Sequence, residues 1–163
     1  QGGNFNTSEI QEDYLISKNF RIFSTQHESH YISSIKMFNQ NKFFGIGPRL
    51  FRIKCKDDIY FTKYGCSTHP HNFYIQLLAE TGIIGFLFLF TLFIFLTYVI
   101  LKLILSENYR SNYSNHKMAI YISIYVSIWP LIPNGNFFNN WLNILLYLPI
   151  PFMLFFFEKE NIK

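Results

Sequence analysis

Charged residues are scarce in this chain: they make up 15% of its 163 residues, while 50% of the residues are hydrophobic. Globular proteins carry about 25% charge, so the composition argues against both a disordered chain and a water-soluble enzyme. Basic residues are also not concentrated. Lys and Arg against Asp and Glu number nine to seven in residues 1–81 and five to three in residues 82–163, which excludes the basic stripe of a nucleic-acid-binding protein. We expect much of the chain to lie in lipid.

The beginning of the chain lacks two familiar features. It has no initiator Met, and residues 1–6 do not show a basic start followed by an apolar stretch, which is the pattern of a signal peptide. We therefore interpret the sequence as a fragment of a longer protein.

Long apolar runs lie in the second half. Residues 83–105 form a run of 23 residues, about 34 Å long as a helix, which is enough to cross a hydrocarbon core of ~30 Å. A shorter run covers residues 118–132, and a third covers residues 141–157, where Pro149 and Pro151 are expected kink points. The sequence predicts an all-α polytopic membrane protein with three transmembrane helices at about these positions.

Basic residues near the membrane ends predict the orientation, because they accumulate on the cytoplasmic side. The first connection carries Lys102, Arg110 and Lys117, and the C-terminal tail carries Lys159 and Lys163. Both are predicted to be cytoplasmic. The uncharged turn of residues 133–140 precedes Trp141, an aromatic residue typical of the interface. Residues 1–81 are then predicted to form a helical loop region on the outer side of the membrane, and residues 82–163 the membrane region.

The loop region contains helix signals. Thr25 and Glu28 have the spacing of a capping box. Apolar residues then recur at one-turn intervals, at Tyr31, Ile32, Ile35 and Phe38. An amphipathic helix is expected over residues 26–40. Gly45 and Gly47 predict a tight turn after it.

The segment of residues 66–85 is predicted to begin a helix near Thr68 or His69, with Pro70 and His71 in its first turn. A polar stripe of Asn72, Gln76 and Glu80 would follow at four-residue intervals, as a solvated or cavity-facing surface rather than a proton relay.

At a helix N-terminus the macrodipole disfavours imidazolium, so His71 is expected to be neutral near pH 7 and able to act as a base. The same end of the helix attracts phosphate oxygens, and Arg49 and Arg52 offer further charge-assisted hydrogen bonds. A base and an anion site are therefore expected side by side at the membrane surface.

These residues resemble the bacterial O-antigen ligases and the related O-antigen polymerases. The resemblance rests on His71-Asn72 followed after nine residues by Gly82, within HPHNFYIQLLAETGIIG, and on the upstream FFGIGPRLF. It also rests on a large periplasmic loop that precedes the last spans. It covers about residues 27–157 and places the sequence at the C-terminal end of such a protein.

The resemblance implies an inverting, metal-independent glycosyltransferase without a cofactor. Such an enzyme transfers a glycan from undecaprenyl diphosphate to lipid A core, or to another glycan chain. Carried over to this chain, His71 would activate the acceptor hydroxyl, and Arg49 and Arg52 would bind the diphosphate, with Asn72 and His27 in support. His27 stands four residues before Tyr31, where the family often has Arg before an aromatic. An isolated fragment is expected to be inactive.

Other interpretations stay open from the sequence. Ligase and polymerase share the donor and are not distinguished, and the sugar is not specified. A non-catalytic membrane scaffold that binds polysaccharide is an alternative, although the predicted spans contain almost no ionisable residue of the kind found in transporters. His71 alone would suit a polar helix start, and Arg49 and Arg52 would suit contact with lipid headgroups.

The two cysteines, Cys55 and Cys66, admit three states. A disulfide is the simplest outcome in an oxidising compartment, and free thiols are a second. With His69 and His71 they have the ligand types of a Cys2His2 zinc site, but neither Cys-x2-Cys nor His-x3-His spacing is present.

Overall fold

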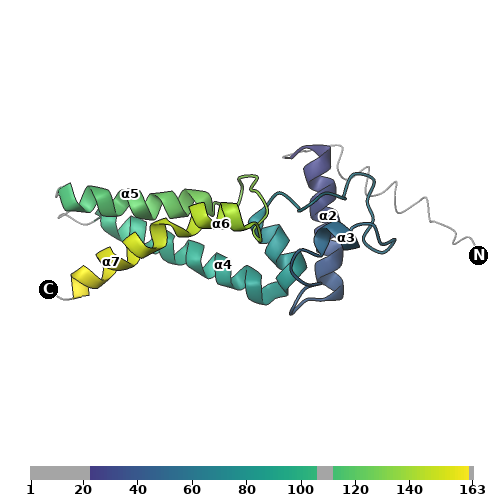
Figure 1. Cartoon of the computed structure of the whole chain (residues 1–163), viewed down its shortest axis with the longest axis horizontal. Helices are drawn as coiled ribbons and strands as arrows, with labels where there is room; N and C mark the ends of the chain where they lie inside the picture. Colours follow the sequence, from purple (N-terminus) through teal and green to yellow (C-terminus); the bar gives the residue numbers. More distant parts are fainter. Residues whose placement is uncertain (1–22, 106–111, 162–163) are drawn as a thin grey trace, which may run out of the picture.

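The computed structural model describes residues 23–105 and 112–161, and this part of the chain is helical with no strand. The all-α expectation is confirmed. Figure 1 shows an elongated stem of α4 to α7, with α2 and α3 packed at one end of α4. The helices are α2 (Thr25–Gln40), α3 (Phe51–Lys54), α4 (Phe73–Leu105), α5 (Asn112–Ser127), α6 (Asn140–Tyr147) and α7 (Pro149–Asn161).

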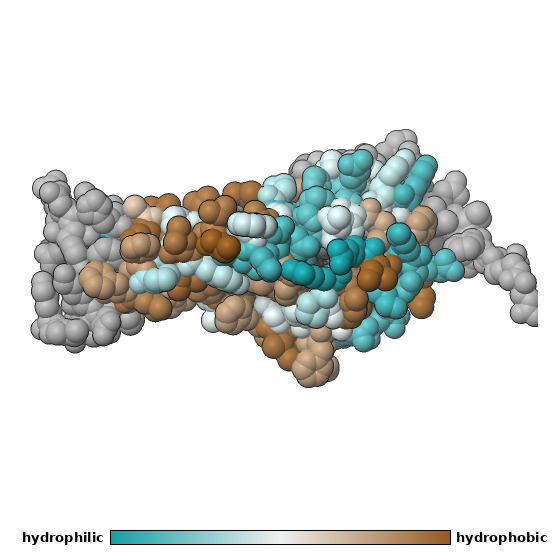
Figure 2. All heavy atoms as spheres, viewed as in Figure 1, coloured by the Kyte–Doolittle hydropathy of each residue, from teal (hydrophilic) through white to brown (hydrophobic). Residues whose placement is uncertain are grey.

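The surface divides in the same way. Figure 2 shows hydrophobic residues over most of the stem and mainly hydrophilic residues over the end formed by α2 and α3. Within the described residues, α4 is the one helix that is long and apolar enough to cross a membrane. Leu89 and Leu96 of α4 pack against Tyr121, Ile124 and Ile128 in the stem core.

The second and third apolar runs do not each form one helix over the predicted bounds. α5 ends at Ser127, so residues 128–132 leave the helix before Pro133. The third apolar run is divided between α6 and α7 at Leu148, next to the expected kink point Pro149. The crossing of the membrane by these segments, the division of the chain at residue 81 and the orientation stay predictions. Arg110 and Lys163 lie outside the described residues.

A kink at Gly82 separates the first turns of α4 from its long apolar part. Gly82 has φ 69° and ψ −161°, which is not helical. Its neighbours bond to the loop that follows α2: Ile46 N–H donates to Ala79 O at 3.0 Å, and Gly47 N–H donates to Glu80 O at 2.9 Å. Ile83 N–H donates to Lys42 O at 2.8 Å. The loop thus supplies partners for backbone groups near the interruption.

Glycine is required on both sides of this contact. A Cβ at Gly82 would collide with the carbonyl of Phe43, and one at Gly45 would collide with the backbone of Glu80. Gly45 and Gly47 also have φ values of 66° and 109°, a region that residues with a side chain rarely adopt. The predicted tight turn is confirmed, and its role is to let two backbones approach.

The N-cap of α2 differs from the prediction. It is Ser24, whose hydroxyl accepts a hydrogen bond from His27 N–H at 3.4 Å. Thr25 is therefore already helical, and the capping box assigned to Thr25 and Glu28 is wrong by one residue. The extent of the helix agrees with the prediction.

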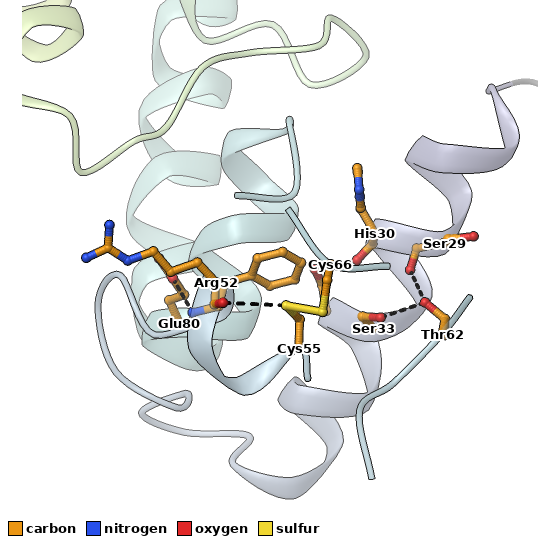
Figure 3. Close-up of a disulfide and its surroundings, with 10 residues drawn as sticks. Ser29, His30, Ser33, Arg52, Cys55, Thr62, Cys66 and Glu80 are labelled. Carbon is orange, nitrogen blue, oxygen red and sulfur yellow. Dashed lines mark hydrogen bonds between the residues drawn. A yellow bond between two sulfur atoms is a disulfide. The ribbon is translucent and has the colours of Figure 1, made fainter. Parts of the chain in front are cut away.

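The buried face of α2 also differs from the predicted apolar one. It consists of His30, Ser33, Ser34 and Met37, whereas Ile32 and Ile35 are exposed. Ser33 bonds to the hydroxyl of Thr62 at 2.8 Å (Figure 3). The buried face of α2 thus packs partly against the polar loop that contains Thr62. Small hydroxyl residues on this face can bond to that loop.

Cys55 and Cys66 form a disulfide (Figure 3). The free-thiol and zinc alternatives are therefore wrong, because neither sulfur remains as a thiolate. Cys55 is buried with Met37, Phe51 and Ala79 in a small core beneath the loop region. The bridge fastens α3 to the segment that leads to His69 and His71.

Gly82→Ala should lower the stability of the protein. The positive φ alone costs about 1–3 kcal/mol for a residue with a side chain, and the new Cβ must also displace the Phe43 carbonyl. Thermal unfolding in detergent measures the loss. Gly85→Ala is the matched control, because its Cβ meets the Thr81 side chain rather than backbone, and it should cost clearly less. Equal midpoints for Gly82→Ala and the parent would contradict the structural requirement.

Removing the disulfide should also destabilise the loop region. Cys55 and Cys66 are separated by 11 positions, and closing a loop of about this length is worth roughly 3 kcal/mol. The double variant Cys55→Ala/Cys66→Ala should unfold at a lower temperature than the parent under non-reducing conditions. Adding a reductant should lower the parent's midpoint and leave that of the double variant unchanged. If the reductant leaves the thermal midpoint of the parent unchanged, the disulfide does not make this contribution to stability.

Candidate functional site

Four histidines gather at the junction of α2 and the segment before α4. His27 and His30 come from α2, and His69 and His71 come from the segment after the disulfide. The ring centroid of His71 lies 4.1 Å from that of His69, 5.4 Å from that of His30 and 5.5 Å from that of His27. The structure therefore brings two predicted site residues, His27 and His71, together.

His71 lies outside α4, contrary to the prediction that it belongs to the first helical turn. The helix begins at Phe73, and Asn72 accepts hydrogen bonds from the N–H groups of Tyr74 at 3.0 Å and Ile75 at 3.1 Å. Asn72 therefore caps the helix. His71 has φ 62°, and its carbonyl accepts a bond from Asn134 N–H at 2.8 Å. A partner distant in the sequence thus holds the residue in a conformation that the local pattern does not indicate.

Burial lowers the pKa of His71 below its ordinary value, and the neighbouring His27 lowers it further. The expected neutral ring agrees with this direction, but the cause is desolvation and a second imidazole rather than the helix dipole. The pKa of His69 is also lowered, first by burial and then by His71. A Ser67 hydroxyl lies 3.2 Å from Nε2 of His71, so the ring has a polar neighbour that orients it.

His30 is the most strongly affected member of the cluster. Burial, followed by the charges of His71, His27 and His69, lowers its pKa to about 4. Its Nδ1 is buried and has no hydrogen-bond partner among the described residues, and the same holds for Nε2 of His69. Burial therefore disfavours the protonated forms of His30, His69 and His71.

Arg49 and Arg52 line a second feature, a cavity of about 310 Å³. Its other side is formed by residues 136 and 138–141, from the turn after α5 and the first residues of α6. Arg49 has φ 62°. Its Nε donates to Phe138 O at 3.1 Å, and its Nη2 donates to the same carbonyl and to Asn140 Oδ1 at 3.5 Å. The guanidinium is thus fixed at the wall of the cavity.

The predicted base does not line this cavity. His71 and Arg49 are instead connected through one turn, because Asn134 N–H bonds to the His71 carbonyl and Phe138 O accepts from Arg49. The expected adjacency of base and anion site is therefore indirect in the described structure. Whether one substrate reaches both stays a prediction.

The predicted polar stripe of α4 is buried, not solvated. Asn72, Gln76 and Glu80 are 5%, 0% and 1% exposed. Gln76 donates to Glu80 and to Asn136, both at 2.9 Å, and its Oε1 accepts from Phe137 N–H. The prediction that this stripe is solvated is wrong, because the turn that contains Asn136 and Phe137 covers it.

The buried stripe also reaches the two neighbouring segments. Asn72 donates to Pro130 O at 2.6 Å, and Glu80 Oε1 accepts from Phe51 N–H at 2.8 Å (Figure 3). The stripe is therefore bonded to both walls of the cavity. One wall is the segment that contains Arg49 and Arg52, and the other is the turn after α5.

A protein-family model described as O-antigen ligase matches residues 13–90. This match supports membership of the O-antigen ligase family for the segment that it covers. The matched segment contains His27, Arg49, Arg52, His71 and Asn72. Comparison with curated proteins and with solved structures found no match.

Sequence reasoning missed the contribution of residues 134–141 to this candidate site. The only local signal was the turn of Pro133, Asn134, Gly135 and Asn136, which is typical of an ordinary connection. Its partners, His71, Gln76 and Arg49, lie more than 55 positions earlier in the chain. Nothing in the local pattern indicates such pairings.

The histidine cluster predicts a loss of stability in mild acid. Because the folded pKa of His30 is about 4 and its ordinary value is 6.5, the unfolded chain binds more protons between these values. The free energy of unfolding is therefore highest above about pH 6.5 and falls as the pH decreases toward 4. At pH 5 the decrease due to His30 is about 2 kcal/mol. His69 and His71 add to the fall with the same sign.

Thermal unfolding at pH 8 and pH 5 tests this expectation with His30→Gln as the matched variant. The parent should lose more stability between the two pH values than the variant does. An equal loss in both proteins would remove His30 as the source.

Proposed function

We propose that this chain is part of a membrane glycosyltransferase that moves a glycan from undecaprenyl diphosphate to an acceptor hydroxyl, as an O-antigen ligase whose acceptor is lipid A core. One observation carries the proposal. Arg49 and His71 are the two non-glycine residues with positive φ in the described part of the chain, and both were selected by sequence reasoning as site residues. Backbone strain of this kind persists where the surroundings enforce it, often at functional sites.

In the proposed reaction, neutral His71 accepts the proton of the acceptor hydroxyl. The hydroxyl oxygen forms a bond to the anomeric carbon from the face opposite the diphosphate, and the bond from that carbon to the diphosphate oxygen breaks. Undecaprenyl diphosphate leaves with the electron pair, and the configuration at the anomeric carbon inverts. General-base assistance of this type contributes typically 10²- to 10⁴-fold.

Arg49 and Arg52 would bind the diphosphate and stabilise the charge on the leaving group, because guanidinium groups form strong hydrogen bonds to phosphate. His27 would keep the His71 proton affinity low, as its contribution to that pKa supports. Asn72 would act as a positioning residue, since it caps α4 directly after His71. No metal takes part in this proposal.

The proposed setting is the bacterial inner membrane. Residues 1–81 would face the periplasm, where lipid-linked glycans are transferred, and three spans would follow with a cytoplasmic C-terminus. The apolar α4 and the division of the surface in Figure 2 support a membrane location.

His71→Asn should abolish most transfer without unfolding the protein. Asn tolerates positive φ better than most residues, so it suits the backbone at φ 62°, but its amide is not a base. Glycosylation of lipid A core in cells that lack their own ligase, supplied with the complete gene, should fall by about 10²- to 10⁴-fold. In vitro, the parental rate should decrease below the pKa of His71, which lies under 6.5, and the variant should lose this dependence.

Two controls separate the alternatives. The thermal midpoint of His71→Asn should stay near that of the parent, which excludes simple misfolding. Glycan that lengthens on the lipid carrier, while lipid A core stays unmodified, would identify a polymerase. Parental transfer by His71→Asn would refute the role of His71 as base.

A further inference from the structure

The cavity beside Arg49 and Arg52 is lined mostly by hydrogen-bond donors. No carboxylate lines it among the described residues. The amide oxygen of Asn136 accepts from Gln76 and from Phe138 N–H, and that of Asn139 accepts from Trp141 N–H at 3.0 Å. These oxygens are engaged within the protein, so the two side chains offer their N–H groups. Donors from both walls suit a ligand rich in oxygen atoms.

Trp141 gives the cavity one large flat surface. It is 80% exposed, although tryptophan is usually well buried. Its backbone N–H bonds to Asn139 at the start of α6, and the neighbouring Phe138 carbonyl accepts from Arg49. The backbone of Trp141 is therefore held close to that of the Arg49 partner. An exposed indole that lines the same cavity as two guanidinium groups combines an apolar platform with cationic donors.

We propose that residues 136–141 form the subsite for the pyranose ring attached to the diphosphate, with Trp141 as the stacking platform. This inference rests on the proposed function, because Arg49 and Arg52 would hold the diphosphate of the same donor. A pyranose has an apolar C–H face and a rim of hydroxyl groups. The indole covers the apolar face, and the asparagine N–H groups donate to the hydroxyl oxygens.

The chemistry of the lining favours this ligand over the interfacial role that the sequence suggested for Trp141. An interfacial anchor needs only an aromatic ring at headgroup depth. Here the ring shares a cavity with two guanidinium groups and three asparagines, and a cavity of about 310 Å³ is at the lower end of the range for small-molecule sites. One sugar ring with its phosphate is a ligand of this size class.

Binding of two probes to the intact protein in nanodiscs tests the proposal. The probes are undecaprenyl diphosphate and undecaprenyl diphosphate that carries one N-acetylglucosamine. Trp141→Ala should weaken binding of the sugar-bearing probe by roughly two- to twelvefold, the range of an aromatic contact, and leave the bare probe within about twofold of the parent value. Trp141→Phe retains a ring and should stay close to the parent with both probes.

Arg52→Ala is the matched control, because it should weaken both probes by the same factor. An equal loss of both probes in Trp141→Ala, or no loss of either, would overturn the sugar subsite. If the bare probe fails to bind and Arg52→Ala changes nothing, the diphosphate assignment fails. In that case a weaker affinity of Trp141→Ala for the sugar-bearing probe would still support the subsite. An unchanged affinity of this variant would overturn it.

Discussion

The backbone contact between the loop after α2 and the kink of α4 determines how the remaining parts are placed. Three hydrogen bonds join residues 42–47 to residues 79–83, and glycines at positions 45 and 82 let the backbones meet. Because a helix that breaks leaves polar groups without partners, the loop and the kink require each other. Arg49 follows the loop directly, so its location is a consequence of this contact.

The turn between α5 and α6 forms the wall of the cavity opposite Arg49 and Arg52, and it is held there by hydrogen bonds to the start of α4. It is bonded to Asn72 at Pro130, to His71 at Asn134 and to Gln76 at residues 136–137. Each of these bonds joins this turn to the segment from His71 to Gln76, at and just before the start of α4. The arrangement explains why a segment outside the family match of residues 13–90 forms half of the cavity.

Local patterns predicted the local features of this fold. The helix over residues 26–40, the glycine turn and the long apolar helix follow from periodicity, backbone freedom and hydropathy. The position of His71 outside α4 does not, because Asn72 takes over as the cap and the bond from Asn134 comes from 63 positions away. For the same reason the sequence indicated Arg49 as a candidate but gave no sign of its carbonyl partner, Phe138.

Arg49 and His71 both have an unfavourable backbone conformation, and both are bonded to the turn between α5 and α6. Positive φ costs of order 1–3 kcal/mol for each residue, yet both are retained, and each is bonded to the same turn, at Asn134 or Phe138. Across the described residues the sole salt bridge joins Lys54 and Asp57, so Arg49 and Arg52 face the cavity without a carboxylate ion pair. Arg49 is held by its bonds to Phe138 and Asn140, and Arg52 interacts electrostatically with Glu80. Two cations at one cavity repel each other, and an anionic ligand would reduce this repulsion. Under the proposed function, the diphosphate of the donor would supply this anionic ligand.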